Sequence, residues 1–195
     1  MALAAGTALL IGCGKSDAPR ISRVEGVRAS GQTLAPQRWC DAFYTGPDAP
    51  TLVLPKVVPA RFGQPLPALR SDRWVWVNLW ATWCGPCRRE MPLVERWHEQ
   101  LGKDGIAADL LFLSVDANEQ DLTRFLQENP RVALGNSVRL AAAPDLDRWL
   151  SGFAGAPTGS IPLQIIAAPG GKVRCIRAGS LREGDYPVVK ALVTS

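Results

Sequence analysis

The sequence contains few residues that bind metal ions. It has one histidine, His98, and one pair of cysteines spaced two residues apart, Cys84 and Cys87. A structural zinc site needs four nitrogen or sulfur ligands, which often come from two such pairs. His98 follows Cys87 by eleven residues, about three helical turns, and therefore cannot share a metal ion with the pair. We predict no metal site and interpret His98 as a solvated helix residue.

The sequence also lacks a strong charge imbalance. Its net charge at pH 7 is +4, and its 22 Lys and Arg residues are scattered along the chain. It has no basic stripe with interleaved aromatic side chains, the usual mark of a nucleic-acid-binding surface. Internal repeats and low-complexity blocks are absent as well. We therefore expect no nucleic-acid partner, and the 195 residues fit one domain with an N-terminal extension.

Charged residues are missing from the first twelve residues, which are apolar or small. This stretch is too short to span a bilayer as a helix, but it matches the apolar part of a secretory signal without the usual basic start. Residues 10–13 resemble the bacterial lipobox, in which the cysteine is acylated. We predict a lipoprotein-type signal over 1–12 and lipidation of Cys13. A plain cleaved signal and an uncleaved anchor are the alternatives, and all three place the domain outside the cytoplasm.

The stretch Trp83–Cys87 is the most informative part of the chain. It follows the apolar run 74–80 and precedes a segment with helical spacing, so the cysteine pair lies where a strand leads into a helix. Cys84 would then lie at the helix cap, where unpaired N–H groups and the helix dipole stabilise a thiolate. Such thiols titrate below the free value of about 8.5, and the thiolate is the species that attacks a disulfide. Cys87, one turn further on, can resolve the mixed disulfide.

The segment 77–92 resembles the active-site segment of the thioredoxin superfamily, and within it the TlpA/ResA-like group of extracytoplasmic thiol-disulfide oxidoreductases. Thioredoxin has a buried aspartate six residues before the first cysteine, whereas this chain has Asn78, as the TlpA/ResA-like group typically does. Glu90 matches that group's glutamate three residues after the second cysteine. The resemblance covers about 62–193. It implies an α/β thioredoxin fold, a central mixed sheet flanked by helices, over 51–195, with a tether and N-terminal extension over 13–50.

The resemblance also assigns roles around the dithiol. It makes Cys84 the nucleophile, Cys87 the resolving thiol and Glu90 a proton acceptor that modulates both, since Glu90 follows Cys87 by one helical turn. The alternative for Glu90 is a solvated helix carboxylate near two arginines. Substrate contacts are expected from the neighbours of the cysteines, Trp83, Gly85 and Pro86; for Trp83 the alternative is packing alone.

Thioredoxin folds place a cis-proline loop opposite the dithiol, just before a strand. Ile161 and Pro162, followed by the short apolar run 163–167 and a Gly-Gly turn, fit this pattern, because cis bonds are largely confined to X-Pro. Pro157 is the competing candidate, and an ordinary trans proline is the alternative for either. The backbone of Ile161 would pair with an incoming substrate chain. The family usually has threonines after this proline and this chain does not, so the substrate groove is expected to differ.

Five cysteines are present. When Cys13 is set aside for lipid and the dithiol is removed, Cys40 and Cys175 remain. In an oxidising compartment an even remainder suggests a structural disulfide between them. The alternative is that Cys175 is a buried free thiol, since cysteine packs well in cores.

Hydrophobic periodicity predicts an order of elements that agrees with the thioredoxin fold independently of the motif. Pro92 should kink the first of the predicted helices. Strands are expected at 51–54, 73–79, 110–115, 163–167 and 172–178, and helices at 86–101, 119–128, 145–153 and 186–193.

These observations predict a protein-disulfide reductase anchored by lipid in the periplasm or another extracytoplasmic space. The Gly-Pro dipeptide between the cysteines matches the reducing members of the superfamily. Family resemblance implies protein thiols or disulfides as substrates, including those of apocytochrome c, a membrane-embedded thiol electron donor and no cofactor. The alternative is a redox-inert or copper-handling protein on the same fold, but the copper-delivering group has a C-x-x-x-C motif and a distant histidine, and this chain has no histidine after His98.

Overall fold

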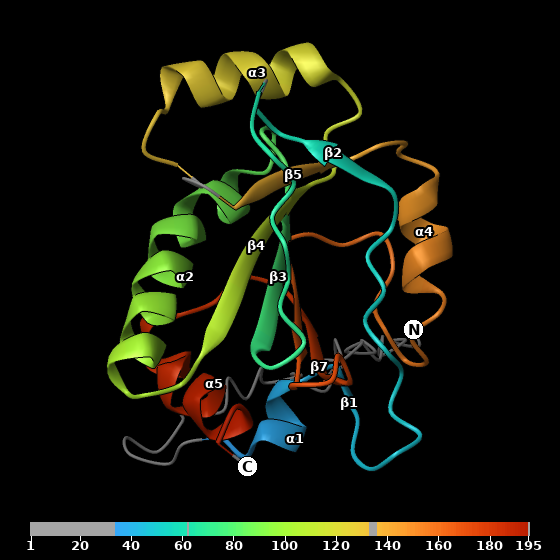
Figure 1. Ribbon diagram of the computed structural model, residues 1–195, viewed down its shortest axis with the longest axis vertical. Helices are drawn as coiled ribbons and strands as arrows, with labels where there is room; N and C mark the ends of the chain where they lie inside the picture. The colour runs from blue at the N-terminus through green and yellow to red at the C-terminus, as the bar shows by residue number, and fades with distance from the viewer. Residues whose placement is uncertain (1–33, 62, 133–135, 195) are drawn as a thin grey trace, which may run out of the picture. The chain divides into compact units, whose positions relative to one another are not determined.

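The computed structural model describes residues 34–61, 63–132 and 136–194 (Figure 1). Within these residues, seven strands form one sheet in the order β1-β7-β6-β3-β4-β5-β2. Its centre is the parallel pair β3 (Trp74–Trp80) and β4 (Ala108–Ser114). On one side, β6 (Leu163–Ala167) and β7 (Val173–Ala178) continue the sheet in antiparallel orientation. On the other side, β5 (Ser137–Leu140) runs parallel to β4, and β2 (Val57–Pro59) is antiparallel at the edge.

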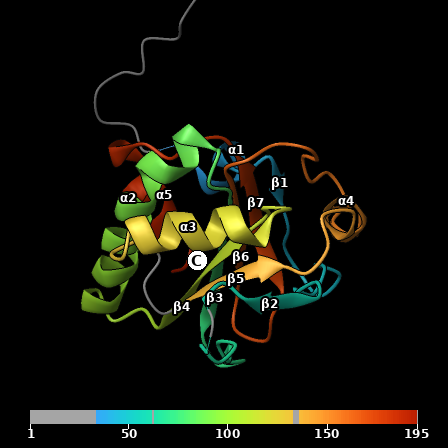
Figure 2. The same ribbon diagram turned by 90° about the horizontal axis from the view of Figure 1, so that it is seen from above.

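Helices cover both faces of this sheet (Figure 2). On one face, α2 (Gly85–Lys103), α3 (Glu119–Glu128) and α5 (Tyr186–Leu192) pack against alternate residues of the strands, among them Trp76 and Phe112. On the other face, α4 (Asp145–Leu150) packs with a second cluster that contains Val77 and Leu111. Successive strand residues point to opposite faces, so a strand covered on both sides must be apolar throughout. This explains the continuous apolar runs 74–77 and 110–113.

The expected fold is confirmed: the chain forms a mixed α/β sheet flanked by helices. The strongest predicted elements agree closely with the observed bounds, and α3 and β6 agree to the residue. Pro92 lies inside α2, which begins at Gly85, has Pro86 in its first turn and ends at the C-cap residue Asp104. Proline is tolerated in the first turn because its missing N–H has no helical partner there.

Short strands account for the errors in the prediction. Instead of a strand at 51–54, the structure has a single bridge between Thr51 and Lys172, and the edge strand is β2. β5 has no predicted counterpart. It spans only four residues, so its alternation is too short to recognise, and it is held by pairing to β4 rather than by its own pattern.

The expected N-terminal extension joins the same sheet from residue 34 onward. α1 (Pro36–Trp39) is followed by β1 (Ala42–Phe43), which pairs antiparallel with β7. Cys40 and Cys175 are joined in the disulfide that the cysteine count suggests. This bond links the segment before residue 51 to a strand inside the sheet.

The predicted signal over 1–12 and the lipidation site Cys13 lie outside the described residues. In the part of the chain that the structure covers, no helix combines the length and the apolar character needed to cross a bilayer.

Candidate active site

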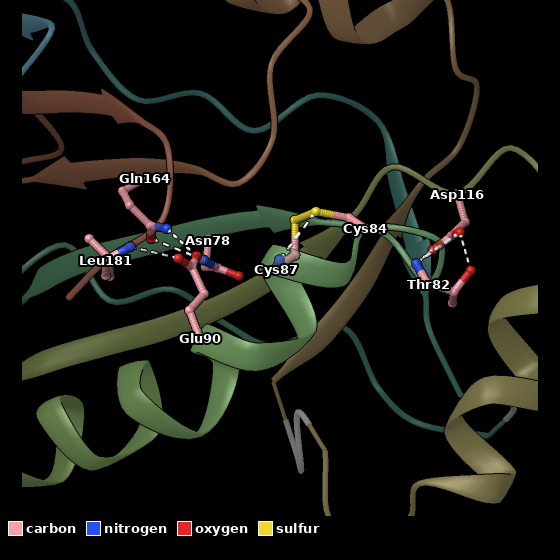
Figure 3. Close-up of a disulfide and its surroundings, with 8 residues drawn as sticks. All are labelled: Asn78, Thr82, Cys84, Cys87, Glu90, Asp116, Gln164 and Leu181. Carbon is pink, nitrogen blue, oxygen red and sulfur yellow. Dashed lines mark hydrogen bonds between the residues drawn. A yellow bond between two sulfur atoms is a disulfide. The ribbon is translucent and has the colours of Figure 1, made fainter. Parts of the chain in front are cut away.

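The cysteine pair lies at the N-terminal end of α2, directly after the loop that follows β3 (Figure 3). Cys84 and Cys87 are joined by a disulfide, and Cys84 is the N-cap residue of the helix. Its Sγ accepts a hydrogen bond from the backbone N–H of Cys87 at 3.2 Å. Both cysteines are buried, but Cys84 is 5% exposed and Cys87 is fully buried, so Cys84 is the nearer of the two to the surface. The positive end of the helix dipole thus lies at the sulfur of the less buried cysteine.

Asp116 holds the loop that leads to Cys84. It lies just beyond the end of β4, next to the end of β3, because the two strands are parallel. Its carboxylate accepts hydrogen bonds from the backbone N–H of Thr82 at 3.0 and 3.1 Å and from the Thr82 hydroxyl at 2.7 Å. The Ser114 hydroxyl donates a further bond to it at 2.7 Å. Sequence analysis gave Asp116 no role, although a carboxylate directly after a continuous apolar strand was a signal for one.

Glu90 is buried, so the interpretation of this residue as a solvated carboxylate is wrong. It follows Cys87 by one turn of α2 on the side that faces the sheet, and it is 3% exposed. One carboxylate oxygen accepts hydrogen bonds from Asn78 Nδ2 at 3.0 Å and from Gln164 Nε2 at 2.8 Å. The other accepts the backbone N–H of Leu181 at 2.9 Å. The two arginines that precede it are exposed and leave its burial intact.

Two opposing effects set the protonation of Glu90. Burial raises its pKa above the ordinary value, because an ionised carboxylate loses its hydration. The hydrogen bonds from Leu181, Asn78 and Gln164, with the positive charge of Arg177, act in the lowering direction. Burial prevails. Glu90 can therefore take up and hold a proton at a higher pH than an exposed glutamate, close to the buried sulfur of Cys87.

A groove gives Glu90 a route to solvent. It has a volume of about 290 Å³ and lies between α2 and the loop before α5. Its walls include Pro86, Arg89, Glu90, Leu93, Leu181 and Glu183. A proton on Glu90 can reach water along this groove without passing the disulfide.

The polar cluster extends from Glu90 into the sheet. Asn78 on β3 and Gln164 on β6 are register partners, and both are fully buried. Gln164 Oε1 accepts hydrogen bonds from Trp76 Nε1 at 2.8 Å and from Asn78 Nδ2 at 3.1 Å. A role for Gln164 is not among the predictions from sequence. The signal was one polar residue in the otherwise apolar run 163–167.

The predicted substrate-contacting residues lie at the same end of the sheet. Trp83 is 70% exposed, so a role in packing alone does not fit it, and Pro86 is exposed beside it. The peptide bond between Ile161 and Pro162 is cis. It immediately precedes Leu163, which pairs with Leu79 near the end of β3. Half-buried Ile161 packs against the apolar cluster that contains both active-site cysteines.

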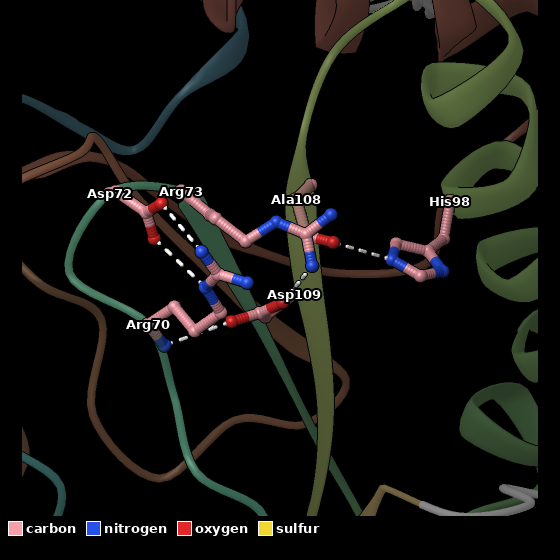
Figure 4. A network of polar contacts seen from close by, with 6 residues as sticks. All are labelled: Arg70, Asp72, Arg73, His98, Ala108 and Asp109. Atoms are coloured by element: carbon pink, nitrogen blue, oxygen red, sulfur yellow. Dashed lines mark hydrogen bonds and ion pairs between the residues drawn. The ribbon is translucent and has the colours of Figure 1, made fainter.

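His98 lies at the opposite end of β4 (Figure 4). Its Nε2 is 2.8 Å from the carbonyl oxygen of Ala108, the first residue of that strand, and the side chain is half-buried rather than solvated. Nearby, Arg73 forms an ion pair with Asp109 at 2.9 Å. Within the described ranges, no group of three or more His, Cys, Asp or Glu side chains is arranged to hold a metal ion.

Comparison with known proteins finds similarity to thioredoxin-like proteins. The Thioredoxin family model matches residues 54–127. Thiol-disulfide oxidoreductase ResA of Oceanobacillus iheyensis is 33% identical over 54 residues, 28% of this chain and 27% of that protein. ResA of Geobacillus thermodenitrificans is 26% identical over 111 residues, 57% of this chain and 58% of that protein. The solved structure of a thioredoxin-related protein from Neisseria meningitidis serogroup B aligns with 72% of this chain and 100% of its own, with 25% identity and a TM-score of 0.53. The matched stretches thus span between about a quarter and three fifths of the two ResA proteins.

Proposed function

Because the Thioredoxin family model matches residues 54–127 and ResA thiol-disulfide oxidoreductases are among the relatives of this chain, we propose that it reduces protein disulfides through Cys84 and Cys87. One observation carries the proposal. Cys84 is the less buried of the two cysteines and caps α2, where its sulfur accepts the N–H of Cys87, while Cys87 is fully buried. This arrangement separates the roles of the two sulfurs, since one can meet a substrate and the other can only meet its neighbour.

The first step is attack by the Cys84 thiolate of the reduced protein. It forms a bond to one sulfur of the substrate disulfide, the substrate S–S bond breaks, and the other substrate sulfur leaves as a thiolate that takes a proton from water. The helix N-terminus stabilises the negative charge on Cys84 before attack. Exposed Trp83 and Pro86, with the Ile161 backbone, are the surfaces that would hold the substrate chain.

The second step resolves the mixed disulfide. The Cys87 thiol gives its proton to the Glu90 carboxylate and attacks Cys84, which releases the second substrate sulfur as a thiolate that is protonated by solvent. The protein is left with the Cys84–Cys87 disulfide seen in the structure, and the substrate has gained two electrons and two protons. Glu90 then returns its proton to water along the groove beside α2. A buried carboxyl group with a raised pKa suits this step, because it holds an accepted proton to a higher pH than an exposed glutamate would.

The Cys84–Cys87 disulfide must then be reduced again by an electron donor outside the protein. We propose a membrane-embedded thiol carrier as the donor, with the domain held outside the cytoplasm by a lipid on Cys13. The Cys40–Cys175 disulfide supports this location, because structural disulfides persist in oxidising compartments. The Gly85–Pro86 dipeptide supports the reducing direction, since thioredoxin has a potential of about −270 mV against about −120 mV for the oxidant DsbA. Apocytochrome c thiols are the substrate class that the resemblance suggests.

Insulin reduction with dithiothreitol as the electron source tests the proposal. Wild-type protein should accelerate precipitation of the insulin B chain, and Cys84→Ser should reduce the rate to background. The double variant Cys40→Ser/Cys175→Ser is the matched control, because it removes a disulfide without touching the active pair. Activity that persists in Cys84→Ser would remove Cys84 from its assigned role. Trapping the thiols by alkylation in cells tests the direction, and a pair found fully oxidised there would indicate an oxidase.

A further inference from the structure

Gln164 occupies a position where its side chain meets the buried carboxylate rather than the substrate groove. It is the second residue after the cis peptide bond. Its neighbours on β6, Leu163 and Ile165, pack in the cluster on the other face of the sheet. Gln164 instead lies on the face of α2, and Figure 3 shows it beside Glu90 and Asn78. Gln164 is therefore part of the immediate surroundings of Glu90.

The amide of Gln164 can adopt only one orientation. The indole N–H of Trp76 is a donor with no acceptor capacity, and it lies 2.8 Å from the oxygen of Gln164. That contact requires the amide oxygen on the Trp76 side and places the NH₂ group 2.8 Å from Glu90. A glutamine reversed in this site would place its NH₂ against the indole N–H and its oxygen against a carboxylate, and both contacts would be repulsive.

The orientation of Gln164 also determines the orientation of the Asn78 amide. Because Gln164 presents an oxygen at 3.1 Å, Asn78 must direct its NH₂ group toward both Gln164 and Glu90. The oxygen of Asn78 is consequently buried without a hydrogen-bond partner. An unsatisfied buried acceptor is costly. The unsatisfied oxygen of Asn78 destabilises the cluster, but this arrangement lets both Asn78 and Gln164 donate to the Glu90 carboxylate.

We propose that Gln164 is a positioning residue that directs an N–H donor at the Glu90 carboxylate and favours its ionised form, and that Trp76 fixes the direction of this donation. The inference rests on the proposed function, in which that carboxylate receives the proton of Cys87. Gln164 would thereby keep Glu90 ionised, and so able to accept the proton of Cys87, down to a lower pH, without contacting the substrate or either sulfur.

The test is a pH titration of Glu90 itself. The titration is monitored by carboxyl ¹³C NMR of the oxidised protein labelled at glutamate, and Glu90→Gln identifies the Glu90 signal. Gln164→Met keeps the length of the side chain and removes both amide groups. It should raise the pKa of Glu90 by about 1 or more, because a hydrogen bond to a charged group is lost. Trp76→Phe, which removes the orienting N–H together with part of the buried ring, should raise it by a smaller amount. Ile165→Ala on the opposite face of β6 is the matched control for a weakened strand and should leave it unchanged.

A kinetic readout connects the titration to the reaction. The pH at which resolution of a trapped mixed disulfide reaches half its maximal rate should rise in Gln164→Met by the same amount as the pKa of Glu90. The inference is overturned if Gln164→Met leaves the Glu90 titration within about 0.3 of wild type, or if Ile165→Ala shifts it equally. If Gln164→Met does not fold, Trp76→Phe carries the test, and an unchanged titration in that variant contradicts the orienting role.

These outcomes are separate from those that test the proposed function. The NMR titration uses the oxidised protein and needs no thiol chemistry. A shifted titration in a protein that cannot reduce insulin would refute the reductase and leave the positioning role intact. If the wild-type protein reduces insulin but Gln164→Met leaves the Glu90 titration unchanged, the positioning role is refuted and the reductase function stands.

Discussion

The two ends of the parallel strands β3 and β4 hold charge in different ways. At the amino end, the ionised side chains pair with one another near solvent: Arg70 with Asp72 at 2.8 Å, and Arg73 with Asp109 at 2.9 Å (Figure 4). At the carboxyl end, Glu90 is 3% exposed, and its hydrogen bonds come from neutral N–H groups (Figure 3).

The difference is visible in the directions of the pKa shifts. The hydrogen bond from Arg70 lowers the pKa of Asp72, whereas burial raises the pKa of Glu90. Exposed ion pairs contribute little to stability, and a buried carboxylate whose hydrogen bonds come from neutral groups is costly to keep. The destabilising burial of Glu90 next to the dithiol indicates a catalytic role for this carboxyl group. The ion pairs at the amino end indicate a role in solubility and strand alignment. The predictions below test this contrast, beginning with the largest expected effect.

Replacing Glu90 should cause the largest loss of activity at the carboxyl end. Glu90→Gln keeps the shape of the side chain but cannot accept the Cys87 proton, so resolution of the mixed disulfide should slow by about a hundredfold at pH 7. Stopped-flow measurement of the resolving step, separate from the first attack by Cys84, provides the check. Asp109→Asn, which alters a carboxylate at the amino end, is the control and should leave both steps unchanged. An equal loss in the two variants would contradict the contrast.

Removing Asp116 should cause the largest loss of stability. Asp116→Ala deletes the acceptor of the Thr82 backbone and hydroxyl and of the Ser114 hydroxyl, in a mostly buried site. We expect the free energy of unfolding to fall by about 2–3 kcal/mol, since hydrogen bonds to charged acceptors are among the stronger ones. Urea unfolding of the oxidised protein measures this value. The loop that leads to Cys84 should also become more mobile in this variant. A decrease in the free energy of unfolding of less than about 0.5 kcal/mol would show that Asp116 does not hold the loop.

The two carboxyl groups with opposite shifts should give opposite dependences of stability on pH. As pH rises above the ordinary Glu90 pKa of 4.5, the unfolded chain releases its proton while the folded chain keeps it, so Glu90 lowers stability until pH exceeds its raised pKa. A rise of one in the pKa corresponds to about 1.4 kcal/mol. Asp72 acts oppositely, because its contribution is present above its ordinary pKa of 3.8 and is lost as pH falls through its lowered pKa.

Urea unfolding across pH, with single variants, separates the two contributions. Glu90→Gln should remove the decline of stability above pH 4.5. Asp72→Asn should reduce only the loss on the acid side. If the stability of Glu90→Gln falls over the same interval as wild type, the decline has another source.

Breaking the ion pair at the amino end should have the smallest effect. Arg73→Ala removes the Arg73–Asp109 pair, in which the arginine side chain is 35% exposed, and should cost about 0.5 kcal/mol and no more than about 1 kcal/mol. The difference from wild type should shrink further in 1 M NaCl, because salt screens exposed charges. Unfolding in low and high salt measures both values. A cost above about 2 kcal/mol would show that the amino end is not the weakly coupled region described above.

Much of this contrast could be predicted from the sequence, and the limits have physical reasons. β3, β4 and α2 were predictable because continuous apolar runs and helical spacing are local signals, and the dithiol lies where they meet. Glu90 could be singled out by its spacing from Cys87, but its burial depends on strands that follow much later in the chain. Gln164 meets Glu90 only because β6 pairs in register with β3. Asp116 meets Thr82 only because β3 and β4 are parallel. β1, β2 and β5 form because neighbouring strands hold them.

The account depends most directly on the unequal reactivity of the two active-site sulfurs. A short pulse of iodoacetamide on the reduced protein at pH 7, followed by peptide mass mapping, measures it. We expect Cys84 to be alkylated faster than free cysteine, with a rate that reaches half its maximum below about pH 8.5, while Cys87 stays largely unmodified. If neither sulfur reacts faster than free cysteine, or if Cys87 is the faster of the two, the proposed division of roles is wrong.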